Sequence, residues 1–128
     1  NGTYHLAIVK ALCYKKVGNI QEGISIIEST LSKQHYAVGS FDYLHLGVMY
    51  GQSGDYEKAI VALKKQQASH DFAEVQYYLA LYYKKMNNIA AYHTAKQSAI
   101  NYYAEKRRMF DQYHYMIDQV FEQDIYKL

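Results

Sequence analysis

A short pattern that occurs three times in this chain places the strongest constraint on its fold. Each copy has a small residue, a tyrosine three positions later, and a helix-stopping residue four positions after the tyrosine. The copies are Ala11, Tyr14 and Gly18; Gly47, Tyr50 and Gly54; and Ala80, Tyr83 and Asn87. A recurrence every ~35 residues is typical of stacked helical hairpins, in which each repeat is one pair of helices. The pattern therefore predicts an all-α repeat scaffold.

The composition supports this fold class and limits the function. The 128-residue chain contains no proline and only seven glycines. Because these are the residues that most often break helices, the composition favours long helices joined by short turns. Half of the residues are hydrophobic and a fifth are charged, which is enough apolar material for one packed domain. The formal net charge of +2 is too small to indicate nucleic-acid binding, which needs dense basic clusters. We expect a single all-α domain with no direct nucleic-acid contact.

Cysteine usage and hydropathy indicate the compartment. Cys13 is the only cysteine, which excludes an intrachain disulfide and a thiolate metal site. No charge-free apolar stretch of about 18 residues and no basic-then-apolar leader are present, so membrane and secretory interpretations lose their usual support. We expect a cytoplasmic protein. Because the sequence begins with Asn1 and not with methionine, we interpret it as a C-terminal fragment of a longer protein.

Hydrophobic spacing divides residues 1–128 into three hairpins and one further helix. Apolar residues recur at helical spacing, as at Ile20, Ile24 and Ile27, and Asp55 is placed to cap a helix after the Gly54 stop. The predicted repeats cover about 4–33, 40–67 and 71–103. Beyond them an amphipathic stripe predicts a C-terminal capping helix over about 106–126, which would shield the last hairpin.

The repeated unit resembles the tetratricopeptide repeat (TPR), and the second copy resembles it most closely. The matching residues are Tyr43, Leu46, Gly47, Tyr50, Gly54, Asp55, Tyr56, Glu57, Ala59 and Leu63. Copy one departs at Lys10 and Gly23, and copy three departs at Asn87, Tyr92 and Lys96. The resemblance implies a right-handed α-α superhelix of three TPR-like hairpins plus the capping helix, with the first helix of each hairpin lining a concave groove.

A looser resemblance concerns the whole composition. Lysine- and tyrosine-rich, proline-free repeats are similar to the peptide-sensing C-terminal halves of Gram-positive quorum-sensing regulators of the Rap, NprR, PlcR and Rgg type. This resemblance implies an alternative function: a peptide-sensing and dimerisation domain of a cytoplasmic bacterial transcription regulator whose DNA-binding domain lies upstream.

The groove implied by the TPR resemblance supplies the candidate binding residues. They are Ile8, Leu12, Lys15, Lys16, Leu44, Val48, Gln52, Tyr77, Leu81, Lys84 and Lys85. Family members that grip a C-terminal carboxylate have Lys and Asn where this chain has Ile8 and Leu12, so that clamp is absent. The remaining pattern, an apolar floor with lysines at one edge, predicts a peptide or protein segment with apolar side chains and an acidic group as the partner.

Other interpretations of these residues remain open. The apolar floor could be filled by the chain's own terminal helix or by a second copy, and lysine pairs on helices are usually solvated. Most tyrosines occupy positions where a large ring packs between hairpins, which favours packing over a base-stacking platform. A second alternative function is a self-associating assembly scaffold, a homodimer through the C-terminal helix. Its exposed stripe would comprise Phe110, Tyr113, Ile117, Val120 and Phe121.

No motif indicates catalysis, a cofactor or a metal. The six histidines stand at 5, 35, 45, 70, 93 and 114, and no two have the three- or four-residue spacing that places ligands on one helical face. The sequence also lacks a glycine-rich phosphate loop and a nucleophile elbow. We predict a protein that is not an enzyme and that needs no cofactor.

Overall fold

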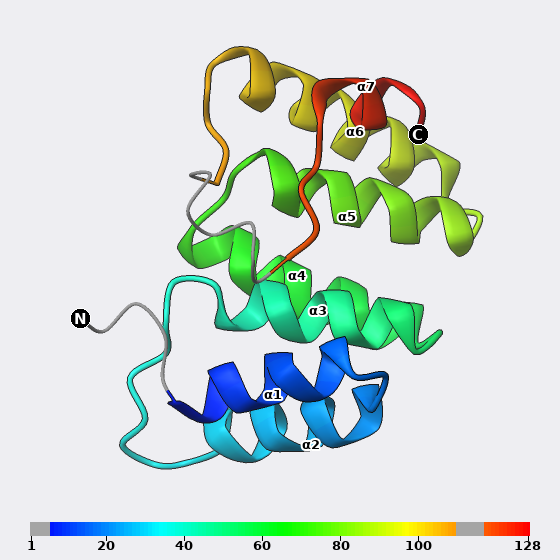
Figure 1. Cartoon of the computed structure of the whole chain (residues 1–128). Helices are drawn as coiled ribbons and strands as arrows, with labels where there is room; N and C mark the ends of the chain where they lie inside the picture. The colour runs from blue at the N-terminus through cyan, green and yellow to red at the C-terminus, as the bar shows by residue number, and fades with distance from the viewer. Residues whose placement is uncertain (1–5, 110–116) are drawn as a thin grey trace.

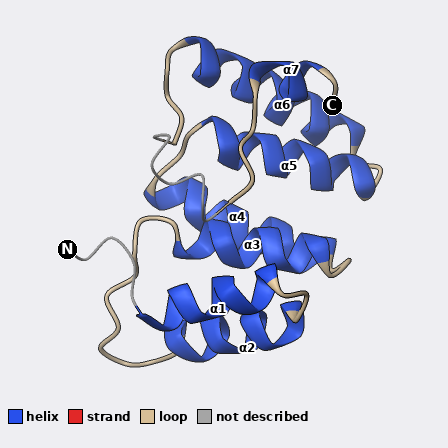
Figure 2. Cartoon of the chain, viewed as in Figure 1, coloured by secondary structure: helices blue, strands red, loops and turns tan. Residues whose placement is uncertain are grey.

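The computed structural model describes residues 6–109 and 117–128, and this part of the chain is all-α (Figures 1 and 2). Six helices pack as three consecutive antiparallel pairs. The pairs are α1 (Leu6–Lys16) with α2 (Ile20–Leu31), α3 (Asp42–Gln52) with α4 (Tyr56–Ser69), and α5 (Ala73–Lys85) with α6 (Ile89–Ala104). A short helix α7 (Glu122–Tyr126) follows and lies against α6. A helix pair therefore lies at each of the three predicted hairpins, although α4 and α6 run to Ser69 and Ala104, slightly beyond the predicted ends at 67 and 103.

The turn inside each pair has the same construction three times. Gly18, Gly54 and Asn87 adopt left-handed backbone angles, with φ of 88°, 90° and 61°. The next residue donates its N–H to the carbonyl of the tyrosine five positions earlier: Asn19 to Tyr14 (2.8 Å), Asp55 to Tyr50 (2.9 Å) and Asn88 to Tyr83 (2.9 Å). This bond closes the helix, as in a Schellman motif. Because Asn tolerates the left-handed region almost as Gly does, the departure at Asn87 leaves the third turn intact.

The residue after each left-handed position also starts the second helix. The side-chain oxygens of Asn19, Asp55 and Asn88 accept hydrogen bonds from the N–H groups of Glu22, Lys58 and Ala91 at 3.4, 3.2 and 3.3 Å. Each cap satisfies one of the N–H groups that the first turn of a helix leaves unbonded. One two-residue turn thus ends one helix and begins the next, and Asp55 caps α4 as predicted.

Small residues allow the helices to approach closely. A Cβ atom on Gly47 would lie 2.7 Å from Cγ of Leu63, so glycine brings α3 against α4. On Gly23, where the TPR pattern usually has alanine, a Cβ would lie 2.8 Å from the Ala11 carbonyl oxygen, so α1 and α2 cross without room for a methyl group. The small residues of the repeat therefore permit a close helix crossing.

A buried glutamine joins the second pair to the loops on either side of it. The side chain of Gln66, which is 1% exposed, accepts a hydrogen bond from the Leu44 N–H (3.1 Å). It also donates to the main-chain oxygens of Ser40 (2.8 Å) and His70 (3.0 Å). Since the N-cap residue of α3, Phe41, provides no side-chain acceptor, Gln66 satisfies an N–H group of the first turn of α3 from α4.

Among the described residues of the predicted helix over about 106–126, only residues 122–126 are helical. Residues 106–109 and 117–121 are not helical, and residues 110–116 lie outside the described residues. Lys106 has a φ of 61° and ends α6 with the same type of closing bond, from the Arg107 N–H to the Tyr102 carbonyl (2.8 Å). The Arg107 carbonyl then accepts a hydrogen bond from the N–H of Ala73 at the start of α5 (2.8 Å). Nε of the Arg107 side chain donates to the Asp71 carbonyl (2.9 Å). These bonds join the residues after α6 to the start of α5.

The predicted self-association stripe is also different in the structure. Phe110 and Tyr113 lie outside the described residues, whereas Ile117 and Val120 are buried in the chain's own core. Only Phe121 of the remaining positions is substantially exposed, at 45%. These residues consequently do not form one exposed helical face. No helix in the described residues combines the length and the apolarity needed to cross a bilayer.

Candidate functional site

The C-terminal segment, residues 117–128, lies across the face formed by α3 and α5 (Figure 1). The side chains of Ile117, Val120 and Ile125 are 3%, 3% and 0% exposed. They belong to the same core cluster as Leu44 and Val48 of α3 and the apolar residues of α5 and α6. Full burial of an aliphatic side chain of this size contributes about 1.5–3 kcal/mol. The segment is therefore held on this face chiefly by three aliphatic side chains.

The far end of the C-terminal segment is held through its main chain. Lys84 Nζ and Tyr92 Oη donate to the main-chain oxygen of Leu128 at 3.1 and 2.6 Å. Lys96 Nζ donates to the main-chain oxygen of Tyr126 at 3.2 Å. The two lysine ammonium groups also lie 5.5 and 5.9 Å from the centre of the Tyr92 ring, one from α5 and one from α6. Two ammonium groups and one phenol thus bind the main chain at the end of the C-terminal segment.

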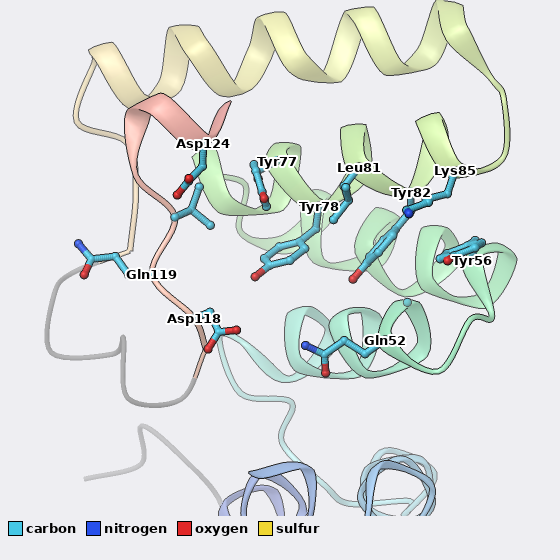
Figure 3. Close-up of a pocket in the computed structure, with 12 residues that line it drawn as sticks. Gln52, Tyr56, Tyr77, Tyr78, Leu81, Tyr82, Lys85, Asp118, Gln119 and Asp124 are labelled. Carbon is cyan, nitrogen blue, oxygen red and sulfur yellow. The ribbon is translucent and has the colours of Figure 1, made fainter. Parts of the chain in front are cut away.

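An open cleft of about 350 Å³ remains beside the C-terminal segment (Figure 3). Its lining comes from α3, from the start of α4, from α5 and from the segment itself. The lining residues are Gly51, Gln52, Tyr56, Tyr77, Tyr78, Leu81, Tyr82, Lys85, Asp118, Gln119, Val120 and Asp124. The lining combines aromatic and aliphatic side chains with hydroxyl, carboxylate, amide and ammonium groups. This combination suits a ligand that has both polar and apolar groups.

Four tyrosines form a continuous row along one wall of the cleft (Figure 3). The ring centres of Tyr77 and Tyr78 are 5.0 Å apart and edge to face, and those of Tyr78 and Tyr82 are 6.0 Å apart and stacked. Tyr56 from α4 stacks on Tyr82 at 5.7 Å. Gly51 makes room for this row, because a Cβ there would lie 2.0 Å from the Tyr82 ring. Burial raises the pKa of Tyr78 and of Tyr82, so both phenols remain protonated near neutral pH.

Charges of opposite sign meet at the cleft. Asp118 and Asp124 of the C-terminal segment line it together with Lys85 of α5. Asp118 also acts on Lys15 of α1: burial lowers the pKa of that ammonium group, and the carboxylate raises it in opposition. Burial raises the pKa of Tyr77, and Asp124 raises it further. The C-terminal segment thus contributes the carboxylates at this face, and α1 and α5 contribute the lysines.

The structure brings only some of the predicted groove residues to this cleft. Gln52, Tyr77, Leu81 and Lys85 line it. Ile8, Leu12, Leu44 and Val48 are buried at 0%, 3%, 0% and 1% exposure and form part of the interior, so they are not an open groove floor as the sequence suggested. The reason is that α1 packs against α2 and α3, while the C-terminal segment covers α3.

The remaining predicted lysines have separate surroundings. Lys84 is engaged with Leu128 and the Tyr92 ring, whereas Lys15 is half-buried near Asp118. Lys16 is exposed at the end of α1 and does not line the cleft. The predicted lysine edge is therefore not continuous: Lys84 contacts the C-terminal segment, Lys85 lines the cleft, and Lys16 does neither.

The candidate residues predicted from the sequence did not include the part of the cleft that comes from the C-terminal segment. Asp118, Gln119 and Asp124 were missed because their apolar neighbours repeat at helical spacing, and this predicted a capping helix on the last hairpin. No local sequence signal marked the end of α6, because lysine has no preference for the left-handed conformation that Lys106 adopts there.

The described residues contain no group of three His, Cys, Asp or Glu side chains placed to hold a metal ion. In comparisons with known proteins, no family model, no curated protein and no solved structure matches this chain. The cleft and the C-terminal segment beside it are therefore the features that bear on function.

Proposed function

We propose that this chain is a protein- or peptide-binding scaffold, a right-handed superhelix of three TPR-like helix pairs that binds a peptide along the face of α3 and α5. The observation that carries the proposal is the open cleft beside the C-terminal segment. It is lined by four of the residues predicted from the repeat register, Gln52, Tyr77, Leu81 and Lys85. The three identical turns support the repeat assignment.

The chemistry of the cleft favours an extended peptide as its ligand. Tyrosine rings offer large, rigid contact area, and their hydroxyl groups can bond peptide N–H and C=O groups. Leu81 adds apolar area, and Lys85 provides a cation for an acidic side chain or a carboxylate terminus. Peptide ligands of helical repeats are bound by this combination of apolar contact and one or two charged anchors.

A selection from a random-peptide display library on the full chain tests this proposal. We expect extended peptides with apolar and acidic residues to be enriched. The substitution Lys85→Glu should then weaken their binding about tenfold, because it places a like charge opposite the acidic group. The matched control is Lys64→Glu, which makes the same charge change at an exposed position of α4.

Two results would contradict the proposal. One is a selection that enriches no peptide although circular dichroism shows a folded helical chain. The other is a set of enriched peptides whose affinity responds equally to Lys85→Glu and Lys64→Glu, because binding would then depend on net charge and not on the cleft.

A further inference from the structure

The C-terminal segment is bound by the rest of the chain in the way that a separate peptide would be bound. Its aliphatic side chains at Ile117, Val120 and Ile125 enter the core. At the other end, the side chains of Lys84 and Lys96 grip main-chain oxygens, which every peptide possesses. Peptide-binding surfaces commonly combine these two modes, in which backbone contacts give affinity and side-chain pockets give specificity.

The segment's charges complement the surface beneath it. Asp118 is exposed in the segment and acts on the half-buried ammonium group of Lys15 in α1. Asp118 and Asp124 share the cleft with Lys85 of α5. The acidic side chains of the segment therefore face cations on two different helices, one on each side of α3.

We infer that the surface of α3, α5 and α6 beneath the C-terminal segment is itself a peptide-docking surface, whose partner is an acidic segment with the chemistry of residues 117–125. That chemistry is two aliphatic residues three positions apart, an acidic residue directly after the first, and a third aliphatic residue five positions after the second. The chain's own C-terminal segment is the resident competitor for this site. This inference rests on the proposed function and names both the partner and the groups that recognise it.

The covalent connection determines how strongly the resident competes. A tethered segment meets its site at an effective concentration in the millimolar range, whereas a separate partner is present at its own concentration. A partner of the same sequence consequently binds weakly to the intact chain, and loosening the resident exposes the site. The partner must displace aliphatic side chains, but it can reuse the donors of Lys84, Tyr92 and Lys96 without change.

The test uses the full chain and a fluorescently labelled synthetic peptide of residues 117–128. The double variant Ile117→Ser and Val120→Ser replaces two buried aliphatic side chains of the resident with polar ones. We expect it to bind the labelled peptide at least tenfold more tightly than the unmodified chain in fluorescence anisotropy. The matched control is Phe121→Ser, a substitution in the same segment at a side chain that is 45% exposed, and it should leave the affinity unchanged.

A second variant protects the test against loss of folding. Val120→Ala removes two methyl groups from the buried contact and keeps the position apolar, so the helix pairs are retained. We expect a smaller gain, of about threefold, with helical circular dichroism equal to that of the unmodified chain. A labelled peptide that carries Asp in place of Val120 should bind neither variant, because its charge would enter the apolar core.

Three outcomes would overturn the inference. The first is a folded variant that binds the labelled peptide no better than the unmodified chain does. The second is equal gain with Phe121→Ser, and the third is a dimer of the loosened variant in light scattering, which would assign the site to a second copy. A further result is that the selected peptides lose affinity on Lys85→Glu and yet bind the double variant and the unmodified chain with equal affinity. In that case the proposed function stands and this inference fails.

Discussion

The buried His45 in α3 makes the stability of this protein sensitive to mild acid. Its side chain is 1% exposed, and burial lowers its pKa from about 6.5 to about 3, with Lys15 contributing in the same direction. The imidazole is therefore neutral in the folded state, whereas the unfolded chain binds a proton at its ordinary pKa. Because the folded state holds this base neutral, its full contribution to the stability of the fold is present above about pH 6.5. This contribution is lost as the pH falls toward 3.

The size of the effect follows from the two pKa values. Each pH unit inside this window costs about 1.4 kcal/mol, because the unfolded state binds one proton more than the folded state. Between pH 6.5 and pH 4.5 the loss is about 2 kcal/mol, because the unfolded imidazole is already half protonated at pH 6.5. The total stability of a domain is roughly 5–15 kcal/mol, so a single side chain would remove a substantial part of it.

Urea unfolding, followed by helical circular dichroism at about pH 7 and about pH 4.5, measures this loss. The comparison chain carries His45→Leu, which has similar volume and no titrating group. We expect the free energy of unfolding of the unmodified chain to fall by about 2–3 kcal/mol more than that of the variant. Because all other titrating groups are common to both chains, the difference isolates the imidazole. Parallel pH dependences for the two chains would refute the reasoning.

Three further substitutions have directions fixed by the structure. Burial raises the pKa of Glu74, whose Oε1 accepts the Met109 N–H (3.1 Å), so its ionisation destabilises the fold as the pH rises through the folded-state pKa. Glu74→Gln keeps the acceptor, so the free energy of unfolding of this variant in urea, relative to that of the unmodified chain, should be higher at pH 7 than at pH 4.5. The same relative stability at both pH values would contradict this. Gly51→Ala should cost about 1–3 kcal/mol, seen as a lower urea midpoint, because its Cβ would meet the Tyr82 ring; an unaltered midpoint would exclude the packing. Asn87→Gly should stabilise by about 0.5 kcal/mol in a thermal melt, since φ at this position is 61°, and a lower melting temperature would count against a left-handed turn there.

The six helices of the three pairs could be predicted from the sequence because their turns carry strong local signals. A glycine or asparagine in the left-handed position, followed by Asn19, Asp55 or Asn88 as a cap, fixes where one helix ends and the next begins. These signals act over a few residues and need no knowledge of tertiary packing.

The C-terminal segment could not be predicted in the same way. Ile117 and Val120 are three positions apart, a spacing that suits one face of a helix, but they are buried in an extended segment. Residue spacing alone does not distinguish these cases when the surface that receives the side chains comes from distant helices. The turn that would have revealed the difference has Lys106 in its left-handed position, and lysine carries no signal for that conformation.

The candidate site was predicted in part for the same reason. Tyr77, Leu81 and Lys85 could be placed because they follow from the register of α5 within the repeat. Leu44 and Val48 were predicted to line a groove that the chain's own terminal helix could fill as an alternative, and residue spacing alone could not decide between an open and a filled groove.

The turn after α6 shows how small a change stops the succession of helix pairs. In the three internal turns, the residue after the left-handed position has a side-chain oxygen that accepts the first N–H groups of a new helix. Arg107 holds the equivalent position, has no acceptor in its side chain, and offers its carbonyl to Ala73 at the start of α5. An acceptor at this position thus accompanies the start of a second helix in the three internal turns, whereas Arg107 ties the end of α6 to the start of α5. A designer could lengthen the array by changing this position before adding any new repeat.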